Sequence, residues 1–301
     1  MDPLILFCKS FRDDVLRVKR LLDSVIRLNE DYIPFYLCIP KNDLSLFQEL
    51  IDFDALRSNY RGKIEIILDE DVVEAMPQGN LETYYSTKGY ISQQIMKAQV
   101  WHLLKCENYL ALDSDSYFTR PFHRKDFLHE SGHPYTVMHD GNELINLSEK
   151  LGYPRVKEAF IRDSQSMKQE FERVGEDYDF GPAPLIWSSQ VWLSLEDHLS
   201  NSSETIWQAF NRLPSEIRWY GETLLKYQAI PIYPTRPIFN CYHYAWQAQY
   251  YKRHPEQMST KNHVIGEVVQ SYWDDSLRPE FAKKPWYSRL WKLIKHGKNQ
   301  T

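Results

Sequence analysis

The sequence predicts an α/β protein in which a mostly parallel sheet is flanked by helices. Short apolar runs alternate with segments of helical period through the first part of the chain. The composition, with 43% hydrophobic and 26% charged residues, is ordinary for a soluble globular protein. The 301 residues are enough for one large α/β domain or two small ones. Alternation at this spacing is typical of parallel strands joined by crossover helices.

The first five elements follow this alternation in order. The apolar run Pro3–Lys9 predicts a buried strand, and apolar residues near helical period predict a helix over Asp13–Leu28. Ile33–Ile39 predicts a second strand and Asn42–Leu50 a second helix. Lys63–Leu68 predicts the third strand. In such sheets ligands bind beyond the carboxyl ends of the strands, so we expect the functional site there.

The middle of the chain contains a helix that leads into a strand. Gly89–Lys105 has a buried side at helical period, and Gln93 and Lys97 lie one turn apart on another side. The apolar run before Asp113 predicts the next strand. Residues 140–178 are polar and weakly periodic, and we expect helices in parts of them.

The later elements are shorter. Asp179–Trp192 has two prolines and a glycine before an apolar run, which predicts a rigid loop entering a strand or helix. Trp219–Tyr227 predicts the start of a helix with Glu222 near its N-terminus, and Ala229–Tyr233 predicts a short strand. Phe239–Trp246 gathers aromatic residues around a histidine.

Charge and cysteine content argue against several classes of protein. Of the 36 Lys/Arg, six follow Glu280 with no Asp/Glu, which leaves 30 basic and 41 acidic residues before that point. An acidic body with a basic tail does not suit nucleic-acid binding. Four well-separated cysteines without CxxC spacing predict buried free thiols rather than disulfides or a zinc site. Because no stretch resembles a membrane span or a signal peptide, we expect a cytoplasmic protein.

Asp113 and Asp115 stand on either side of one serine at the end of an apolar run. Side chains at i and i+2 share a face of a strand, so both carboxylates point the same way. Two like charges this close repel each other unless something offsets them. Two Asp at this spacing also occur in ordinary loops. At the edge of an α/β sheet we favour a divalent cation, because hard cations bind carboxylates together with substrate phosphates.

The sequence around this pair resembles a known family. LALDSDSYFTRPF, preceded by a helix with the pattern QQIMKAQ, is similar to the DxD-centred core of GT-A-fold glycosyltransferases, especially bacterial ones associated with cell-surface polysaccharides. The resemblance covers roughly residues 1–125 and continues more loosely through PAPLIWS, WYGE and CYHY. It implies a GT-A-like, Rossmann-type sheet. It also implies that Asp113 and Asp115 bind Mn²⁺ or Mg²⁺, which binds the diphosphate of a nucleotide-sugar donor.

The resemblance implies further donor contacts. The residues expected to bind the donor or its nucleotide are Ser10, Arg12, Gln94, Lys97, Asp113 and Ser114. Lys97 would add a positive charge near the diphosphate, and a solvated surface lysine is the alternative. Ser10 and Arg12 follow the first strand, where the family binds the nucleotide. A capping and surface role is the alternative for these two residues.

The acceptor is expected to be a saccharide or a lipid-linked saccharide. An inverting enzyme needs a carboxylate base for the attacking hydroxyl. Glu222 is the candidate by similarity to the family's late acidic position, and an acidic residue favoured at a helix N-terminus is the alternative. The residues expected to contact the acceptor are Pro184, Trp187, Trp219 and Tyr220. The sequence leaves open whether the enzyme inverts or retains.

His243 is the candidate for a third metal ligand, as a C-terminal histidine often is in the family. Imidazole is a poor ligand for Mg²⁺ but suits Mn²⁺ and other transition ions. A histidine inside FNCYHYAW is also typical of a partly buried core residue. His263 is a weaker alternative for the same role.

We expect a GT-A-like glycosyltransferase domain over residues 1–280 and a basic amphipathic tail over residues 281–301. Pro285–Ile294 predicts a helix with aromatic residues on one side and Lys/Arg on the other. Such a helix favours peripheral contact with anionic lipids at the inner face of the cell membrane. Packing of the helix against the domain is the alternative.

Two other functions compete with glycosyl transfer. A haloacid-dehalogenase-like phosphatase also uses two Asp at this spacing after a strand. That family expects Thr or Val beyond the second Asp and a motif near the N-terminus, whereas this chain has Tyr117 and Phe118 in mid-chain. The other alternative is a non-catalytic carbohydrate- or nucleotide-binding protein that keeps the fold.

Overall fold

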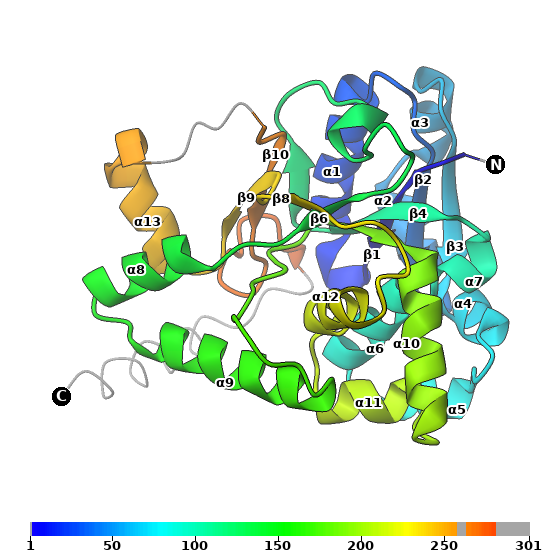
Figure 1. Cartoon of the computed structure of the whole chain (residues 1–301). Helices are drawn as coiled ribbons and strands as arrows, with labels where there is room; N and C mark the ends of the chain where they lie inside the picture. Colours follow the sequence, from blue (N-terminus) through cyan, green and yellow to red (C-terminus); the bar gives the residue numbers. More distant parts are fainter. Residues whose placement is uncertain (1, 258–262, 281–301) are drawn as a thin grey trace.

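The computed structural model describes residues 2–257 and 263–280, and a five-stranded sheet forms the centre of this part of the chain (Figure 1). The strand order is β3-β2-β1-β4-β7; the first four strands are parallel, and β7 runs antiparallel to β4. The bounds are Ile5–Lys9 for β1, Phe35–Ile39 for β2, Ile64–Leu68 for β3, Asn108–Asp113 for β4 and Leu185–Ser188 for β7.

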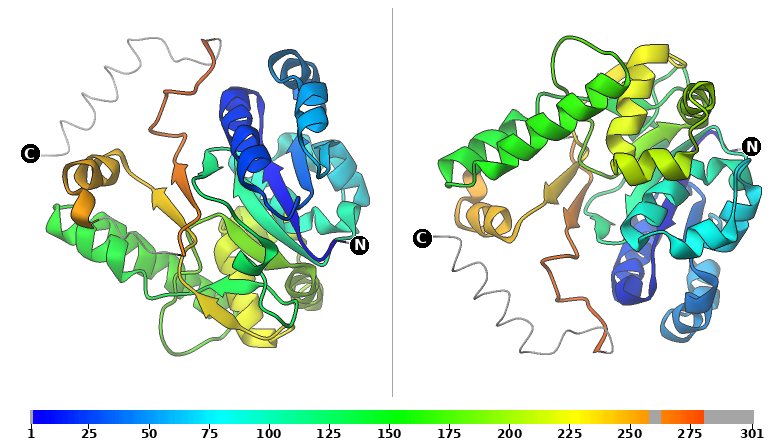
Figure 2. Two further views of the ribbon diagram at one scale, coloured as in Figure 1. Left: turned by 90° about the horizontal axis from the view of Figure 1, so that it is seen from above. Right: turned by 90° about the horizontal axis from the view of Figure 1, so that it is seen from below.

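Helices cover both faces of this sheet (Figure 2). Alternate side chains of β1 enter two separate cores, as the pleat of a strand requires. The helices on the face of Leu6 are α1 (Val15–Leu28), α2 (Leu44–Leu50) and α3 (Phe53–Asn59). The helices on the face of Phe7 are α4 (Asp69–Ala75), α5 (Leu81–Ser86), α6 (Gly89–Gln99), α7 (Trp101–Leu104), α10 (Ser189–Asn201), α11 (Ile206–Arg212) and α12 (Glu216–Tyr227). The predicted mixed α/β class, with a mostly parallel sheet between helices, is confirmed.

Two small sheets extend the fold beyond β4. The first has the order β5-β10-β9, with β5 at Ser116–Phe118, β10 at Gly266–Val269 and β9 at Phe239–Tyr242. The second pairs β6 (Tyr135–Val137) with β8 (Tyr233–Thr235). Because β5 begins at Ser116, the acid pair Asp113 and Asp115 lies at the junction of the central sheet and the β5-β10-β9 sheet.

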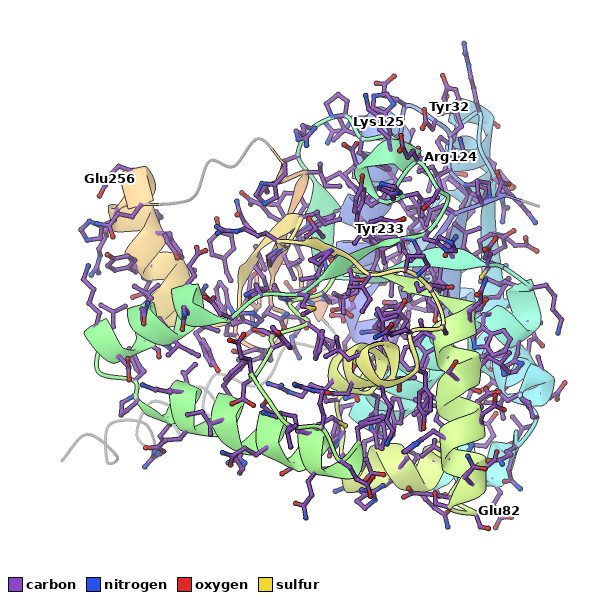
Figure 3. The ribbon with its side chains drawn as sticks, viewed as in Figure 1. Tyr32, Glu82, Arg124, Lys125, Tyr233 and Glu256 are labelled. Carbon is purple, nitrogen blue, oxygen red and sulfur yellow. The ribbon has the colours of Figure 1, made fainter. Side chains whose placement is uncertain are left out.

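Three further helices lie on the side of the molecule away from β3 (Figure 1). They are α8 (Asn142–Lys150), α9 (Arg155–Glu170) and α13 (Ala245–Arg253). Short 3-10 turns complete the described chain at Arg12–Asp14, Lys41–Asp43, Arg124–Asp126 and Pro255–Gln257. Of these, the turn Arg124–Asp126 lies near Tyr32, at the amino-terminal ends of the parallel strands (Figure 3).

Several boundaries differ from those predicted. The helix expected from Trp219 begins at Glu216, because the side chain of Ser215 accepts a hydrogen bond from the Arg218 amide. The helix expected over Gly89–Lys105 is divided at Val100, where the carbonyl accepts an i+3 bond from the Leu103 amide.

The third difference concerns the short strand expected over Ala229–Tyr233, which is found instead at Tyr233–Thr235. It pairs there with β6. The predicted helix Pro285–Ile294 and the tail 281–301 lie outside the described residues. None of the described helices has the length and apolar character needed to cross a membrane.

Candidate functional site

The acid pair sits at the carboxyl edge of the central sheet. Asp113 is the last residue of β4 and is aligned with Lys9, the last residue of β1. Ser10 therefore follows directly beside it. Side chains at this edge of a parallel sheet converge on a common region outside the strands, which is where ligands bind in open α/β sheets.

Lys97 joins this edge to α12. Its ammonium nitrogen lies 2.5 Å from Oδ1 of Asp113 and 3.2 Å from Oε1 of Glu216, and Lys97 is buried. Burial alone would lower the pKa of Lys97, but the carboxylates of Asp113 and Glu216 raise it, so the lysine stays charged. Gln94, one turn earlier on α6, accepts a hydrogen bond from the Glu216 amide at 3.2 Å. Gln94 and Lys97 of this helix therefore both contact Glu216, and Lys97 also contacts Asp113.

Asp115 is buried and only partly satisfied. Its Oδ2 accepts a hydrogen bond from the Ser271 amide at 2.8 Å, whereas its buried Oδ1 has no hydrogen-bond partner. Burial, together with the negative charge of Asp113, raises the pKa of Asp115 to about 7. A buried carboxylate oxygen without a donor is costly, so this oxygen is suited to a cation that the protein alone does not supply.

Ser114 is held inside the protein. Its hydroxyl donates to Oδ2 of Asp14 at 2.9 Å, and Oδ1 of Asp14 is paired with Arg17 at 2.7 Å. Arg17 also donates to the backbone carbonyl of Asp274. The hydroxyl of Ser114 therefore links the acid pair to α1 and to the segment after β10, and it is not directed at a ligand in this arrangement.

Ser10 and Arg12, the two other residues predicted to bind the nucleotide-sugar donor, differ in burial. Ser10 is buried, and its hydroxyl has no hydrogen-bond partner, so it is a polar group at the acid edge that the fold leaves unused. Arg12 is exposed, and its backbone amide donates to Asp43 at 2.9 Å. The structure thus brings Lys97 into contact with Asp113, places Ser10 at the end of the neighbouring strand and joins Gln94 to Glu216, while Arg12 lies on the surface beyond β1.

The donor set of the acid pair fits a hard divalent cation. Asp113 and Asp115 offer carboxylate oxygens on one edge, one of them without a partner. Within residues 2–257 and 263–280, no three or more His, Cys, Asp or Glu side chains are gathered closely enough to hold a metal ion. His243 therefore does not join the pair as a third ligand here, and phosphate oxygens of a substrate would have to complete the set.

A cavity of about 110 Å³ lies against β9, in the small sheet that also contains β5, and neither Asp113 nor Asp115 is among its lining residues. Its lining includes His139, Asp179, Cys241 and His243. Val268 of β10 is aligned with Cys241 of β9 on one side and with Ser116 of β5 on the other. Cys241, in the cavity wall, is therefore two strands away from Ser116, the residue after Asp115. Burial and then the charge of Asp115 raise the pKa of the Cys241 thiol, with Asp113 and Asp179 adding to the effect. The cavity and the acid pair are therefore two parts of one region.

Backbone pairing fixes the other wall of this cavity. The amide of His139 donates to the carbonyl of Asp179 at 3.0 Å, and the amide of Asp179 donates back at 2.7 Å. Oδ1 of Asp179 accepts from the Gly181 amide at 2.9 Å. His243 also lines the cavity, and burial lowers its pKa despite the opposing charge of Asp179. A carboxylate and two imidazoles thus meet at a concave surface.

Glu222 occupies a different environment. It lies in the middle of α12, is 1% exposed and is bound by both Nε and Nη2 of Arg173, the latter at 2.8 Å. We expected it at a helix N-terminus facing an acceptor. The structure instead engages both of its carboxylate oxygens in a buried ion pair, which holds the segment after α9 against α12.

The predicted acceptor aromatics are core residues. Trp187, Trp219 and Tyr220 are 2%, 0% and 3% exposed, and they pack in the core on the Phe7 face of the sheet. The Tyr220 hydroxyl accepts from the Ser188 amide at 2.9 Å, so its polar end is also engaged internally. Pro184 is buried as well, whereas Pro182 of the same loop lines the cavity. None of the four predicted residues presents a face to an acceptor.

Sequence reasoning missed Asp179, His139 and Glu216. Asp179 stood at the start of the proline-rich loop that the sequence did single out, so its position before a rigid turn was the available signal. Glu216 was overlooked because the helix was expected to begin three residues later. Nothing near His139 in the sequence indicates that it pairs with a segment 40 residues onward.

Comparison with known proteins gives one family and a distant structural likeness. Residues 3–284 match the sequence model of a family described as "Family of unknown function (DUF6492)". No curated protein matches the sequence. The apo crystal structure of mouse xyloside xylosyltransferase 1 is similar to this structure with a TM-score of 0.46 and 12% sequence identity, over 94% of this chain and 99% of that chain.

Proposed function

The chain belongs to the family of unknown function DUF6492, and we propose that it is a glycosyltransferase that moves a sugar from a nucleotide-sugar donor to a saccharide or lipid-linked acceptor. One observation carries the proposal. Asp113 ends a parallel strand at the ligand-binding edge, and Asp115 lies in the turn between this strand and β5 rather than on the strand itself. A buried oxygen of Asp115 has no partner, while Lys97 holds Asp113. The resemblance to bacterial DxD enzymes further suggests a role in surface polysaccharide synthesis.

On the donor side, Asp113 and Asp115 would hold Mn²⁺ or Mg²⁺ together with the donor diphosphate. When bound, the metal offsets the negative charge that develops on the leaving diphosphate. Lys97 keeps Asp113 in place, and Gln94 orients the start of α12 through the Glu216 amide. The unused hydroxyl of Ser10 is available to the nucleotide at the end of β1.

On the acceptor side, we assign the carboxylate to Asp179 in place of Glu222. An inverting transfer needs a base within reach of the acceptor hydroxyl. Asp179 lines the cavity against β9, whereas both oxygens of Glu222 are bound by Arg173. Asp179 would take the proton of the attacking hydroxyl, and Glu222 would position the loop that carries Asp179.

The proposal is tested with a panel of nucleotide sugars. Each is scored for metal-dependent thermal stabilisation and for slow donor hydrolysis, with the parent protein and with Asp115→Ala. We expect at least one nucleotide sugar to stabilise the parent in Mn²⁺ or Mg²⁺, and the variant to lose this response. Lys19→Ala, on an exposed residue of α1, is the matched control.

Two outcomes would contradict the proposal: no nucleotide sugar stabilises the parent with either metal, or Asp115→Ala behaves like the parent. Intact binding without hydrolysis or transfer would instead favour the non-catalytic binding protein. The phosphatase alternative places its acid pair after the first strand, whereas this pair follows β4, the central sheet's fourth strand in sequence.

We further propose that residues 1–280 form the catalytic domain and that residues 281–301 bring it to an anionic membrane. The support is the sequence alone, with six Lys/Arg and no Asp/Glu in this tail. Deletion of residues 282–301 should weaken sedimentation with anionic liposomes and leave neutral liposomes unaffected. Unchanged sedimentation would remove the membrane assignment and leave the catalytic one standing.

A further inference from the structure

A groove runs outward from the cavity beside Asp179, between α8 and α13. The inner cavity is lined by Glu143 and Tyr251, and both residues also line a second, more open hollow of about 430 Å³. This outer hollow ends at Lys150 and Gln257. The two hollows share these residues and therefore adjoin, leading from Asp179 to Lys150 and Gln257.

Two side-chain contacts join α8 to α13 at this groove. The hydroxyl of Tyr251 donates to Oε1 of Glu143, near the start of α8, at 3.4 Å, and Lys150, at the end of α8, donates to the Tyr250 hydroxyl at 2.9 Å. Glu143 of α8 and Gln247 of α13 line the inner cavity, whereas Lys150 and Gln257 line the outer hollow alone. Glu256 lies just beyond the end of α13 (Figure 3). The nine residues of α13 give a length of about 14 Å.

The side chains along the groove suit a sugar chain. Tyr250 and Tyr251 supply flat amphipathic rings, and the polar groups are carboxylate, amide and ammonium. Stacking of Tyr153 on Trp246, with ring centroids 4.6 Å apart, ties the loop after α8 to α13. A groove that is already held in shape loses little conformational entropy when a ligand binds.

Size and charge select among acceptors. The inner cavity of about 110 Å³ is smaller than the roughly 300 Å³ at which ligand pockets begin, and the outer hollow makes up the difference. The cavity lining contains Asp179 and Glu143, and among its described residues there is no Lys or Arg. A phosphate group there would meet like charge, so the units that enter first are uncharged.

We propose that this groove binds the acceptor as an extended, uncharged oligosaccharide whose reactive end reaches the cavity beside Asp179. The proposal rests on the glycosyltransferase function and specifies its acceptor class. It excludes a bare monosaccharide as the full acceptor, because a monosaccharide leaves the outer hollow unused. It also excludes a lipid-linked acceptor whose diphosphate enters the cavity.

The test uses titration calorimetry of the full chain. The probes are neutral ladders of glucans, xylans, galactans and mannans, from monosaccharide to hexasaccharide, with an oligogalacturonate ladder as the anionic counterpart. We expect affinity in one neutral ladder to rise by about tenfold or more with length, and the galacturonates to bind more weakly than galactans. Tyr250→Ala should remove most of the gain with length.

The matched control is Tyr32→Ala, because Tyr32 is exposed at the opposite end of the molecule (Figure 3). If Tyr250→Ala disturbs α13, Asn146→Ala on α8 tests the same outer hollow from the other wall. The inference is overturned if no ladder binds, if affinity is independent of length, if the anionic ladder binds best, or if both variants keep the gain with length.

Nucleotide-sugar stabilisation with Mn²⁺ is measured on the same samples. If it persists while sugar-chain binding shows no dependence on length, this inference fails and the glycosyltransferase proposal stands. If nucleotide sugars do not bind while the neutral ladder binds in the groove, the enzyme assignment fails and the groove is a saccharide-binding site alone.

Discussion

The ammonium group of Lys97 lies 2.5 Å from the carboxylate of Asp113, at the carboxyl end of β4. The side chain of Lys97 is 5% exposed and that of Asp113 is 27% exposed, so a buried cation reaches the partly hydrated member of the acid pair. Asp115, the buried member, has no such partner on Oδ1. The positive charge of Lys97 thus balances the carboxylate of Asp113, whereas Oδ1 of Asp115 is left for a ligand.

Lys97→Met should destabilise the fold by about 3 kcal/mol. The substitution keeps the apolar stem but leaves Asp113 and Glu216 without their shared cation. The partial hydration of Asp113 keeps the cost toward the low end of the range for broken buried pairs. Urea denaturation measures the change. Lys19→Met removes an exposed ion pair of 3.9 Å and should cost less than about 1 kcal/mol. Equal costs for the two variants would contradict the role given to Lys97.

Glu222→Gln and Asp179→Asn should separate stability from catalysis. In Glu222→Gln the partly buried Arg173 loses its anionic partner, so we expect a loss of about 3 kcal/mol in unfolding free energy with little change in kcat per folded molecule. Asp179→Asn keeps the acceptor oxygen for the Gly181 amide, so the fold should be unaffected. Its transfer rate should fall by about a hundredfold or more if the enzyme inverts. The opposite pattern would return the base role to Glu222.

Local sequence patterns were sufficient to predict the order of helices and strands in the first half of the fold. The strands from β1 to β4 have long apolar runs, and α1 and α6 have clear helical periodicity, so their order and the edge they create could be predicted. The same reasoning predicted that Lys97 adds a positive charge near the donor diphosphate, and in the structure Lys97 contacts Asp113. These inferences depend on neighbours in sequence.

The acceptor side depends on partners that are distant in sequence. Glu222 meets an arginine 49 residues upstream, in a region with weak periodicity, and no local pattern signals that pair. Asp179 pairs through its backbone with His139, 40 residues upstream, and shares a cavity with β9, which is 60 residues downstream. The aromatic residues misled us because a tryptophan in a core and one in a sugar site have the same local sequence signature.

Acidification should weaken the fold through His243. Burial lowers the pKa of this histidine below its ordinary value of 6.5, although Asp179 acts in the opposite sense and the Cys241 thiol lies 3.7 Å from Nδ1. As pH falls through 6.5 the unfolded chain takes up a proton that folded His243 does not. The unfolded state then binds more protons, and stability declines until the lowered folded pKa is reached.

His243→Gln removes this proton linkage. The difference in unfolding free energy between about pH 7.5 and about pH 5.5 should therefore be smaller in the variant than in the parent. Urea denaturation at a series of pH values measures it. Parallel curves for the two proteins would show that His243 does not contribute to the pH dependence.

Gly221→Ala tests how the loop bearing Asp179 is held. Gly221 lies inside α12, and a Cβ there would overlap the ring of Phe180, the buried residue next to Asp179. We expect a loss of about 1–3 kcal/mol from overpacking, together with reduced transfer activity as the loop shifts. Gly89→Ala is the matched control in α6, because nothing lies within 4 Å of its Cβ, and there the gain in helix propensity should stabilise by up to about 1 kcal/mol. Thermal unfolding and transfer rates measure both variants. If Gly221→Ala is as stable and as active as Gly89→Ala, the contact between α12 and Phe180 does not position Asp179.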